Sequence, residues 1–311
     1  MTDLKLRIFI YIKVKTEGIK MDISIVIPVY KAENHLVELY NRLITTLKLI
    51  TQDYEIIMID DCSADRSWEV IIELAESDCR VKGYKFSRNF GQHYGLTAGL
   101  DYCRGDWVVI MDCDLQDQPE EILRLYQKAQ EGYDVVVAKR HKRPETISNR
   151  IMSWSFYKIF SYFLDYHYDG SIGNFRIMSK KVVKNCREMR ENLRFLGALI
   201  DSMGFSTASI EVNQAKRMKD NSSYTFKKKC KLASEAIIAN SDKPLRLSVK
   251  LGCCISLLAL ISIPVANNII VSIYFIGGLI IANLGIIGIY LGKAFNEIKK
   301  RPLYIIDKST I

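Results

Sequence analysis

The sequence predicts an α/β fold in which a mostly parallel sheet carries helices on both faces and is followed by a C-terminal pair of apolar helices. Short apolar segments alternate with segments of helical period between residues 21 and 139. Such alternation is typical of parallel strands joined by right-handed helical crossovers. Two apolar runs separated by a polar turn then occupy residues 245–291. The length of 311 residues, of which 49% are hydrophobic, allows one large domain and a smaller unit.

The elements of the domain follow in chain order. Strands are expected at 23–27, 54–59, 81–86, 107–111 and 134–138, with helices at 33–50, 66–76, 92–103 and 119–130 between them. After these we expect an aromatic-rich amphipathic helix at 149–165, a short strand within 173–178, helices near 179–188 and 192–203, and a strand at 206–212. The domain therefore spans residues 21–240, and its amphipathic helix either joins the core or rests on lipid.

The first twenty residues are expected to be an extension of this domain. Their apolar stretch, Ile8 to Ile12, is too short to cross a bilayer and has no small-residue cleavage site after it. The segment is therefore not read as a signal peptide. It is either an addition from an upstream start codon, a disordered segment or a basic segment on the membrane surface, and the sequence does not choose among these.

Two transmembrane helices are predicted within residues 241–295, at about 247–266 and 269–291. The second run contains no charge and is long enough to span, whereas the first reaches spanning length only if Arg246 and Lys250 extend toward the headgroups. Basic residues flank the pair on both outer sides and are absent from its turn, which places both outer ends in the cytoplasm. The sheet domain and a tail at 296–311 are then cytoplasmic.

The net charge indicates which kinds of ligand the protein binds, and the cysteine spacing indicates the state of its thiols. A formal charge of +9 suits a phosphate-bearing substrate, a nucleic acid or an anionic membrane. The basic, aromatic-containing segment 217–231 directly precedes the membrane helices, so a lipid phosphate is favoured there and no nucleic acid is expected. The eight cysteines are scattered without paired spacing, which favours reduced thiols over disulfides or zinc.

Carboxylates gather where the strand at 107–111 ends. Asp112 and Asp114 are separated by one residue, and Asp117 follows three residues later. Two carboxylates at this spacing can share Mg²⁺ or Mn²⁺, whose remaining positions are filled by water and phosphate oxygens. The alternative is a solvated turn after a buried strand.

Other polar groups follow the neighbouring strands. Asp61 comes after the second strand, where a carboxylate can accept hydrogen bonds from a base or ribose, while Ser63 and Asp65 can cap the next helix. Arg88 lies just before a helix start and suits a phosphate. His93 is either a proton-transfer group or a surface residue. The cations between 139 and 150 are either a solvated run or a site for an anionic second substrate.

Taken together, the motifs resemble those of family 2 glycosyltransferases of the dolichol-phosphate mannose synthase and bactoprenol glucosyltransferase type. The resemblance covers Met21 to about Ile306. It implies a GT-A-type, Rossmann-like sheet in a protein integral to the inner membrane of a bacterium. The motifs that carry it are Ile27-Pro28-Val29-Tyr30, Asp60-Asp61-x-Ser63-x-Asp65, Ser87-Arg88-Asn89-Phe90-Gly91, Met111-Asp112-x-Asp114-Leu115-Gln116-Asp117, Lys243-Pro244-Leu245-Arg246 and Arg301-Pro302-Leu303-Tyr304.

The resemblance also implies roles for single residues. Pro28, Tyr30 and Asp61 would contact the nucleotide base and ribose, and Glu33 and Arg88 are further expected contacts of the nucleotide sugar. Asp112, Asp114 and Gln116 would bind the metal and diphosphate, with Asp114, Gln116 and Arg140 as the catalytic set. Arg140, with Arg150 and Ser153, would bind the acceptor phosphate, and Arg217, Ser222 and Tyr224 belong to a loop that folds over the donor.

Three departures from the family pattern leave the donor sugar open. They are Tyr30-Lys31-Ala32 for Tyr-Asn-Glu, Gly173-Asn174-Phe175-Arg176 for Gly-Asp-Phe-Arg, and Asp220-Asn221-Ser222-Ser223-Tyr224 for Gly-x-Ser-Lys-Tyr.

The expected activity is inverting transfer from a nucleotide diphosphate sugar to polyprenyl (undecaprenyl) phosphate at the cytoplasmic face of the membrane, serving cell-surface polysaccharide or lipopolysaccharide modification. The Gln-x-x-Arg-Trp motif of processive enzymes is missing, which favours a phosphate acceptor. The alternatives are transfer to a hydroxyl of a lipid-linked saccharide, with Asp117 or Asp201 as base, and a catalytically inactive membrane scaffold. The sequence leaves a homo-oligomer open.

Overall fold

The computed structural model describes residues 22–140, 162, 172–191, 196–212, 237, 241, 243–262 and 269–311. The expected extension at 1–20 and nearly all of the expected helix at 149–165 lie outside these ranges.

An eight-stranded sheet forms the centre of the protein, with the order β7-β5-β6-β4-β1-β2-β3-β8. Neighbours pair in parallel at β1–β2, β1–β4, β2–β3 and β5–β7, while β6 and β8 run antiparallel to the strands beside them. The sheet is therefore mostly parallel, as predicted. The strands are β1 (Ile23–Val29), β2 (Tyr54–Asp60), β3 (Val81–Phe86), β4 (Trp107–Ile110), β5 (Val135–Arg140), β6 (Ile172–Ser179), β7 (Thr207–Val212) and β8 (Ile306–Ser309).

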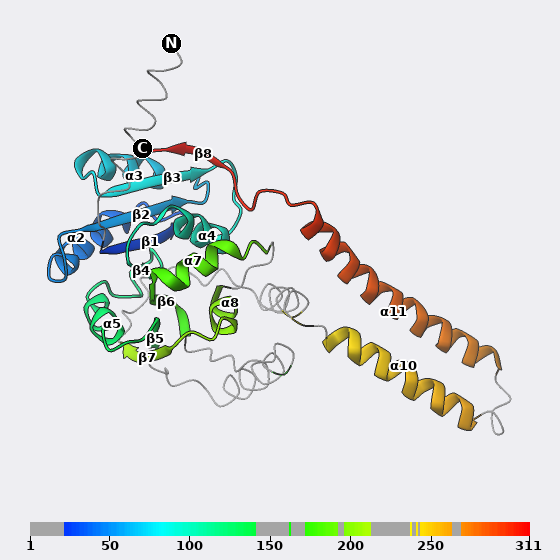
Figure 1. Cartoon of the computed structure of the whole chain (residues 1–311). Helices are drawn as coiled ribbons and strands as arrows, with labels where there is room; N and C mark the ends of the chain where they lie inside the picture. The colour runs from blue at the N-terminus through cyan, green and yellow to red at the C-terminus, as the bar shows by residue number, and fades with distance from the viewer. Residues whose placement is uncertain are drawn as a thin grey trace, which may run out of the picture.

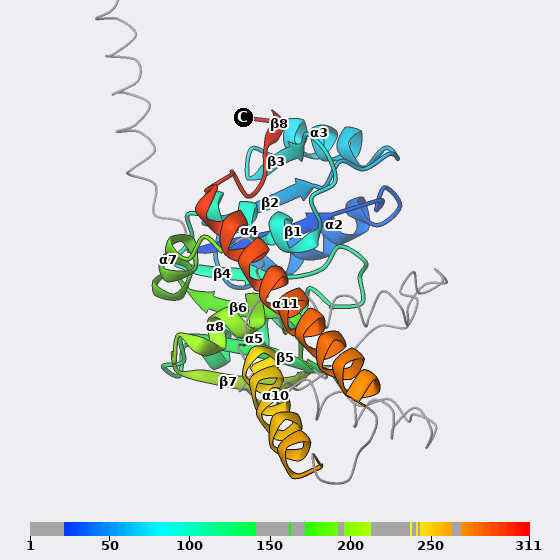
Figure 2. The same cartoon turned by 90° about the vertical axis from the view of Figure 1, so that its right-hand side faces the viewer.

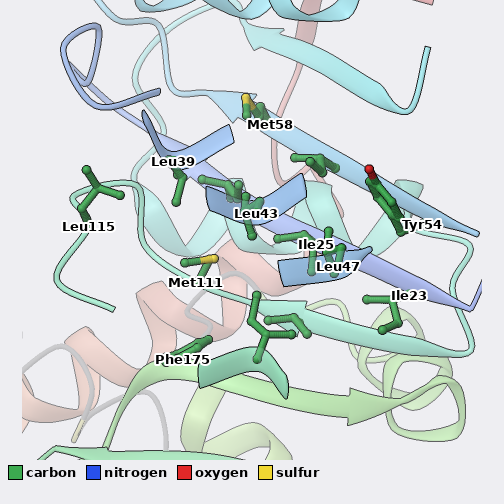
Figure 3. Close-up of a cluster of buried hydrophobic side chains, with 14 of the residues drawn as sticks. Ile23, Ile25, Leu39, Leu43, Leu47, Tyr54, Met58, Met111, Leu115 and Phe175 are labelled. Atoms are coloured by element: carbon green, nitrogen blue, oxygen red, sulfur yellow. The ribbon is translucent and has the colours of Figure 1, made fainter. Parts of the chain in front are cut away.

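Helices cover both faces of the sheet, and the alternation of side chains along β1 shows how. Ile23, Ile25 and Ile27 pack in one buried cluster with α2, α3 and α5, whereas Val26 packs in the other with α4, α7 and α8. Figure 3 shows the first cluster, in which Leu39 of α2 lies near β1. The helices are α2 (Leu36–Leu47), α3 (Ser67–Ser77), α4 (Gln92–Tyr102), α5 (Glu121–Ala129), α7 (Lys180–Glu188) and α8 (Leu196–Ser202).

Two glycines bring α4 close to β1. A Cβ atom added to Gly99 would lie 2.1 Å from Cγ1 of Val26, and one added to Gly95 would lie 3.1 Å from Cβ of Pro28. Because real Cβ atoms do not approach so closely at the first of these positions, the helix can pack here only with glycine. This contact fixes the N-terminus of α4 beside the carboxyl end of β1.

The C-terminal tail contributes an edge strand, which sequence analysis did not identify. β8 pairs antiparallel with β3, and Thr310 exchanges hydrogen bonds with Gly83, whose N–H donates to Oγ1 and whose carbonyl accepts from the Thr310 N–H. Figure 1 shows the chain returning from α11 to this edge of the sheet. Residues 306–309 of the expected tail thus belong to the central sheet.

Two long helices, α10 (Lys243–Ser262) and α11 (Ile269–Ile298), run side by side away from the sheet domain (Figures 1 and 2). The Tyr290 hydroxyl of α11 donates to the carbonyl oxygen of Ser241 at 2.6 Å. Among the described residues, one stretch is long and apolar enough to cross a membrane, Ile276–Ile298. Residues 263–266 of the expected span at 247–266 lie outside the described residues, so the membrane hairpin stays a prediction.

Candidate active site

The predicted site residues follow strands whose carboxyl ends lie at one edge of the sheet. β2 and β4 both run parallel to β1, so Asp61 and Asp112 emerge at this edge. β5 is antiparallel to β6, which is antiparallel to β4, and Arg140 at the end of β5 therefore belongs to the same edge. Val212, the last residue of β7, pairs with Arg140. With β3, which runs parallel to β2, the sheet thus gathers the carboxyl ends of six strands at one side.

Three non-glycine residues at this edge have left-handed backbone angles. Lys31, Cys62 and Leu115 have φ values of 53°, 56° and 58°, and each lies within a few residues of a strand end. This conformation disfavours residues with a side chain, and such strain tends to gather at functional sites. The backbone conformation of these turns therefore indicates a functional site at this edge, independently of the carboxylates.

Asp61 organises the loop before α4. Its Oδ1 accepts a hydrogen bond from the Phe90 N–H at 2.7 Å, and its Oδ2 accepts one from the Gly91 N–H at 2.9 Å. The carboxyl is 3% exposed, and burial raises its pKa above 3.8 although both backbone bonds oppose this rise. In this arrangement Asp61 holds the loop itself, and a contact with the nucleotide base or ribose remains a prediction.

The turn after β1 is held against the turn after β2. Three successive backbone N–H groups donate to side chains of the second turn, Lys31 to Ser63 (3.0 Å), Ala32 to Ser67 (2.9 Å) and Glu33 to Asp65 (3.3 Å). The Asp65 carboxylate also accepts hydrogen bonds from the N–H and hydroxyl of Ser67, the first residue of α3, although Arg66 and not Asp65 occupies the N-cap position. The Ser63 hydroxyl does not cap α3 but accepts the bond from Lys31 in the turn after β1.

Glu33 also helps to begin α3. Its Oε2 accepts a hydrogen bond from the Arg66 N–H at 2.8 Å. This contact gives Glu33 a structural role, and its expected contact with a nucleotide sugar remains a prediction.

Tyr30 and Pro28 differ in exposure. The Tyr30 side chain is 49% exposed, with the Lys31 ammonium 5.4 Å from its ring centre. An exposed ring at the sheet edge can stack on a nucleotide base. Pro28 is buried beneath Gly95 of α4. The Pro28 ring is therefore covered by α4 here, and its expected contact with the nucleotide remains a prediction.

Asp112 is contacted by two amide side chains that sequence analysis did not assign to the site. Gln92, the first residue of α4, donates from Nε2 to Oδ1 of Asp112 at 2.7 Å. Asn174 of β6 donates from Nδ2 to the same oxygen at 3.4 Å. The only sequence signal for Asn174 was its departure from the family pattern, and Gln92 had none beyond its place at a helix start.

Asp114 and Gln116 lie together in the turn at Leu115. The backbone N–H of Gln116 donates to Oδ1 of Asp114 at 3.1 Å, and its side-chain amide donates to Oδ2 at 2.5 Å. Within the described part of the chain, no group of three or more Asp, Glu, His or Cys side chains is arranged to hold a metal ion. Asp112, Asp114 and the Gln116 amide nevertheless provide oxygen donors at a half-open edge, which fits a hard divalent cation completed by water and phosphate.

Arg88 and His93 occupy different environments. The Arg88 side chain is exposed, with its guanidinium 4.1 Å from the ring centre of Phe90. It is therefore available to a phosphate at this edge. Burial lowers the pKa of His93, so its imidazole is neutral near pH 7.

Asp117 and Asp201, the alternative bases, also differ. Asp117 is 1% exposed, so a substrate hydroxyl does not reach it in this arrangement. Asp201 is an exposed residue of α8. The electrostatic influence of Arg176 opposes the desolvation that raises the pKa of this carboxyl.

Several predicted site residues lie wholly or partly outside the described residues. Arg140 is the last residue of β5, but its side chain is not among those that the structure describes. The same holds for all of Arg150, Ser153, Arg217, Ser222 and Tyr224.

Comparisons with known proteins give a consistent result. A family model described as Glycosyl transferase family 2 matches residues 24–187. The uncharacterized glycosyltransferase YkcC of Bacillus subtilis (strain 168) is 36% identical over 301 residues, covering 92% of this chain and 93% of the relative. The bactoprenol glucosyl transferase of Shigella phage SfII is 34% identical over 305 residues, covering 93% and 98%. An undecaprenyl-phosphate 4-deoxy-4-formamido-L-arabinose transferase of Photorhabdus laumondii is 31% identical over 308 residues, covering 92% and 93%.

Proposed function

The chain belongs to glycosyl transferase family 2, and from this membership we propose that it moves a sugar from a nucleotide diphosphate sugar to a polyprenyl phosphate. Two relatives similar along nearly their whole length carry names of transferases that act with bactoprenol or undecaprenyl phosphate. The observation that carries the proposal is the edge where Asp112, Asp114 and Gln116 lie beside the loop held by Asp61. This edge can bind both the nucleotide base and the diphosphate of a nucleotide sugar.

On the donor side, the residues of this edge bind and orient. Tyr30 offers an exposed ring to the base, and Arg88 offers its guanidinium to phosphate oxygens. Asp112, Asp114 and Gln116 would hold Mg²⁺ or Mn²⁺, which when bound supplies positive charge to the leaving diphosphate. Asp112 is oriented for this by Gln92.

On the acceptor side, no general base is required. A lipid phosphate with a second pKa of about 6 is largely ionised near neutral pH and attacks directly. Its oxygen forms a bond to the anomeric carbon as the bond to the diphosphate oxygen breaks, so the configuration inverts and no proton moves. We assign the acceptor phosphate to Arg140, with Arg150 and Ser153. The burial of Asp117 agrees with a mechanism that needs no base there.

The membrane arrangement is part of the same proposal. α11 includes a stretch that is long and apolar enough to span, and α10 begins with Lys243 and contains Arg246 and Lys250. We propose that both helices enter the cytoplasmic membrane of a bacterium, with the sheet domain on the cytoplasmic side. Arg217, Ser222 and Tyr224, which follow β7 in the sequence, are then assigned to the loop over the donor.

The test is a product analysis. Membranes holding the protein are incubated with undecaprenyl phosphate, Mg²⁺ and a panel of nucleotide sugars, and lipids are examined by mass spectrometry. We expect a sugar linked through one phosphate, and none with membranes holding Asp114→Ala. A diphosphate-linked product would indicate sugar-phosphate transfer instead, and sugar found only on a glycolipid hydroxyl would favour the other acceptor class.

A further inference from the structure

The chain after α11 is attached directly to the segment that leads into the donor site. Phe86, the last residue of β3, pairs with Ile306 of β8. The next residue, Ser87, donates its backbone N–H to the carbonyl oxygen of Ile305 at 3.1 Å. Residues 88–91 follow at once and form the loop that Asp61 holds. The tail is therefore bonded to the beginning of this loop.

Aromatic rings continue this connection into the loop. The ring of Tyr304 stacks on Phe86 with centres 5.3 Å apart and planes at 25°. Phe86 meets Phe90 edge to face at 5.4 Å, and the Phe90 N–H donates to Asp61. Phe86 is 0% exposed, so it has little freedom to move independently of the rings on either side. The three rings form a packed path from the tail to Asp61.

The Tyr304 hydroxyl makes a second attachment at α4. It donates to Oδ2 of Asp101 at 2.7 Å, and Arg190 donates to the same oxygen at 2.7 Å. Burial and the bond to Asp101 raise the pKa of Tyr304, which keeps the hydroxyl protonated as a donor. α4 begins with Gln92, which donates to Asp112. Tyr304 therefore contacts β3, which precedes the loop, and α4, which follows it.

Tyr304 is also close to α11 along the chain. Only the five residues 299–303 separate it from Ile298, the last residue of α11. A displacement of α11 relative to the sheet is therefore passed to Tyr304 through a short connection.

We propose that Tyr304 is a positioning residue for donor binding, through which the placement of α11 controls the loop at 87–91. The inference rests on the proposed function, because it assumes that this loop receives the nucleotide diphosphate. Tyr304 touches no substrate in this scheme. It acts through Phe86 and Phe90 on the backbone bonds that hold Asp61.

The experiment compares three variants of the full chain in detergent. Tyr304→Ala removes the ring and the hydroxyl, and Tyr304→Phe keeps the ring. Tyr102→Ala is the matched control, because Tyr102 stacks on Tyr84 of β3 at 4.1 Å, whereas Phe90 of the loop meets the rings of Phe86 and Tyr94. Affinity for the nucleoside diphosphate of the accepted donor is measured by calorimetry with Mg²⁺, and KM and kcat are measured for both substrates.

We expect Tyr304→Ala to weaken nucleotide binding and raise the donor KM about three- to tenfold, the factor that one aromatic contact provides. The acceptor KM should stay within about twofold, since the acceptor does not meet this loop. Tyr304→Phe should recover most of the affinity, and Tyr102→Ala should bind as the parent does even if its melting temperature falls.

Two results would overturn the inference. One is unchanged nucleotide affinity in a folded Tyr304→Ala protein, and the other is an equal loss of affinity in Tyr102→Ala. If the parent protein itself bound no nucleoside diphosphate, the proposed function would fail instead. Should Tyr304→Ala not fold, Phe90→Leu breaks the next contact of the same path, the edge contact between Phe86 and Phe90, and should give the same rise in donor KM.

Discussion

Asp61 and Phe90 are joined by a hydrogen bond of 2.7 Å from the backbone N–H of Phe90 to the Asp61 carboxylate. The bond links the end of β2 to the loop before α4, two segments 29 residues apart in the chain. Because Asp61 is buried, its charge is costly unless such donors surround it. The shape of the loop at 88–91 is thereby tied to the ionisation of one carboxyl.

The first prediction concerns that ionisation. Burial raises the folded-state pKa of Asp61, so the folded protein holds a proton that the unfolded chain releases above pH 3.8. The contribution of Asp61 to stability is then largest below about pH 3.8 and falls as pH rises through the raised pKa. Asp61→Asn removes this dependence. In detergent, we expect the free energy of unfolding of the variant to rise relative to that of the parent as pH increases from about 4 to 7.

Chemical unfolding followed by tryptophan fluorescence measures this difference. The neighbouring Asp60 also has a raised pKa, while Arg88 lowers that of Asp61. Asp60→Asn is therefore measured in parallel to separate the two carboxyls. A constant difference between Asp61→Asn and the parent across this range would contradict the assignment.

The second prediction concerns Asp114. Asp114→Ala should reduce transfer about 100-fold or more and abolish metal-dependent nucleotide binding, because a carboxylate in an open turn serves a ligand and not the core. The melting temperature should stay within a few degrees. Asp106→Ala is the control. Asp106 lies just before the first residue of β4, at the end of the strand away from the site, and pairs with Lys180 at 3.1 Å. Substantial turnover of Asp114→Ala in saturating Mg²⁺ or Mn²⁺ would show that the metal lies elsewhere.

The third prediction separates the two substrates at Arg140. A guanidinium can form paired charge-assisted bonds to a phosphate, and an ammonium cannot reproduce both. Arg140→Lys should raise the KM for polyprenyl phosphate about tenfold and leave the donor KM nearly unchanged. The exposed Arg104, in the loop after α4, provides an Arg→Lys control. An equal effect on both substrates would move Arg140 to the donor side.

The fourth prediction tests whether α11 spans the membrane. Ile287 lies at the middle of the apolar stretch and is 50% exposed, whereas Ile298 at its end is 74% exposed. A lysine at the middle costs about 2.5–3.5 kcal/mol on insertion scales, and one at the end reaches the headgroups. Ile287→Lys should therefore shift the protein out of the carbonate-resistant membrane fraction, while Ile298→Lys should not. Identical extraction of both variants would argue against a span centred here.

The sequence by itself determined the five strands from β1 to β5, the helices between them and the group at the end of β4. Each of these depends on local order along the chain. A run such as Trp107 to Ile110 is buried in any parallel sheet, and Asp112 and Asp114 then emerge at its carboxyl end. The family motifs added expected roles to these positions, and family membership was confirmed by the comparisons.

Only the tertiary structure decided which partners these residues have. Asn174 meets Asp112 because β6 inserts antiparallel beside β4, and Glu33 is engaged by Arg66 because two turns happen to lie side by side. The pairing of β8 with β3 joins residues more than 200 positions apart. A four-residue strand has no hydrophobic period long enough to be recognised alone, and it forms because β3 offers an unpaired edge. Long-range packing, which local patterns do not encode, thus placed Tyr304 beside the donor loop.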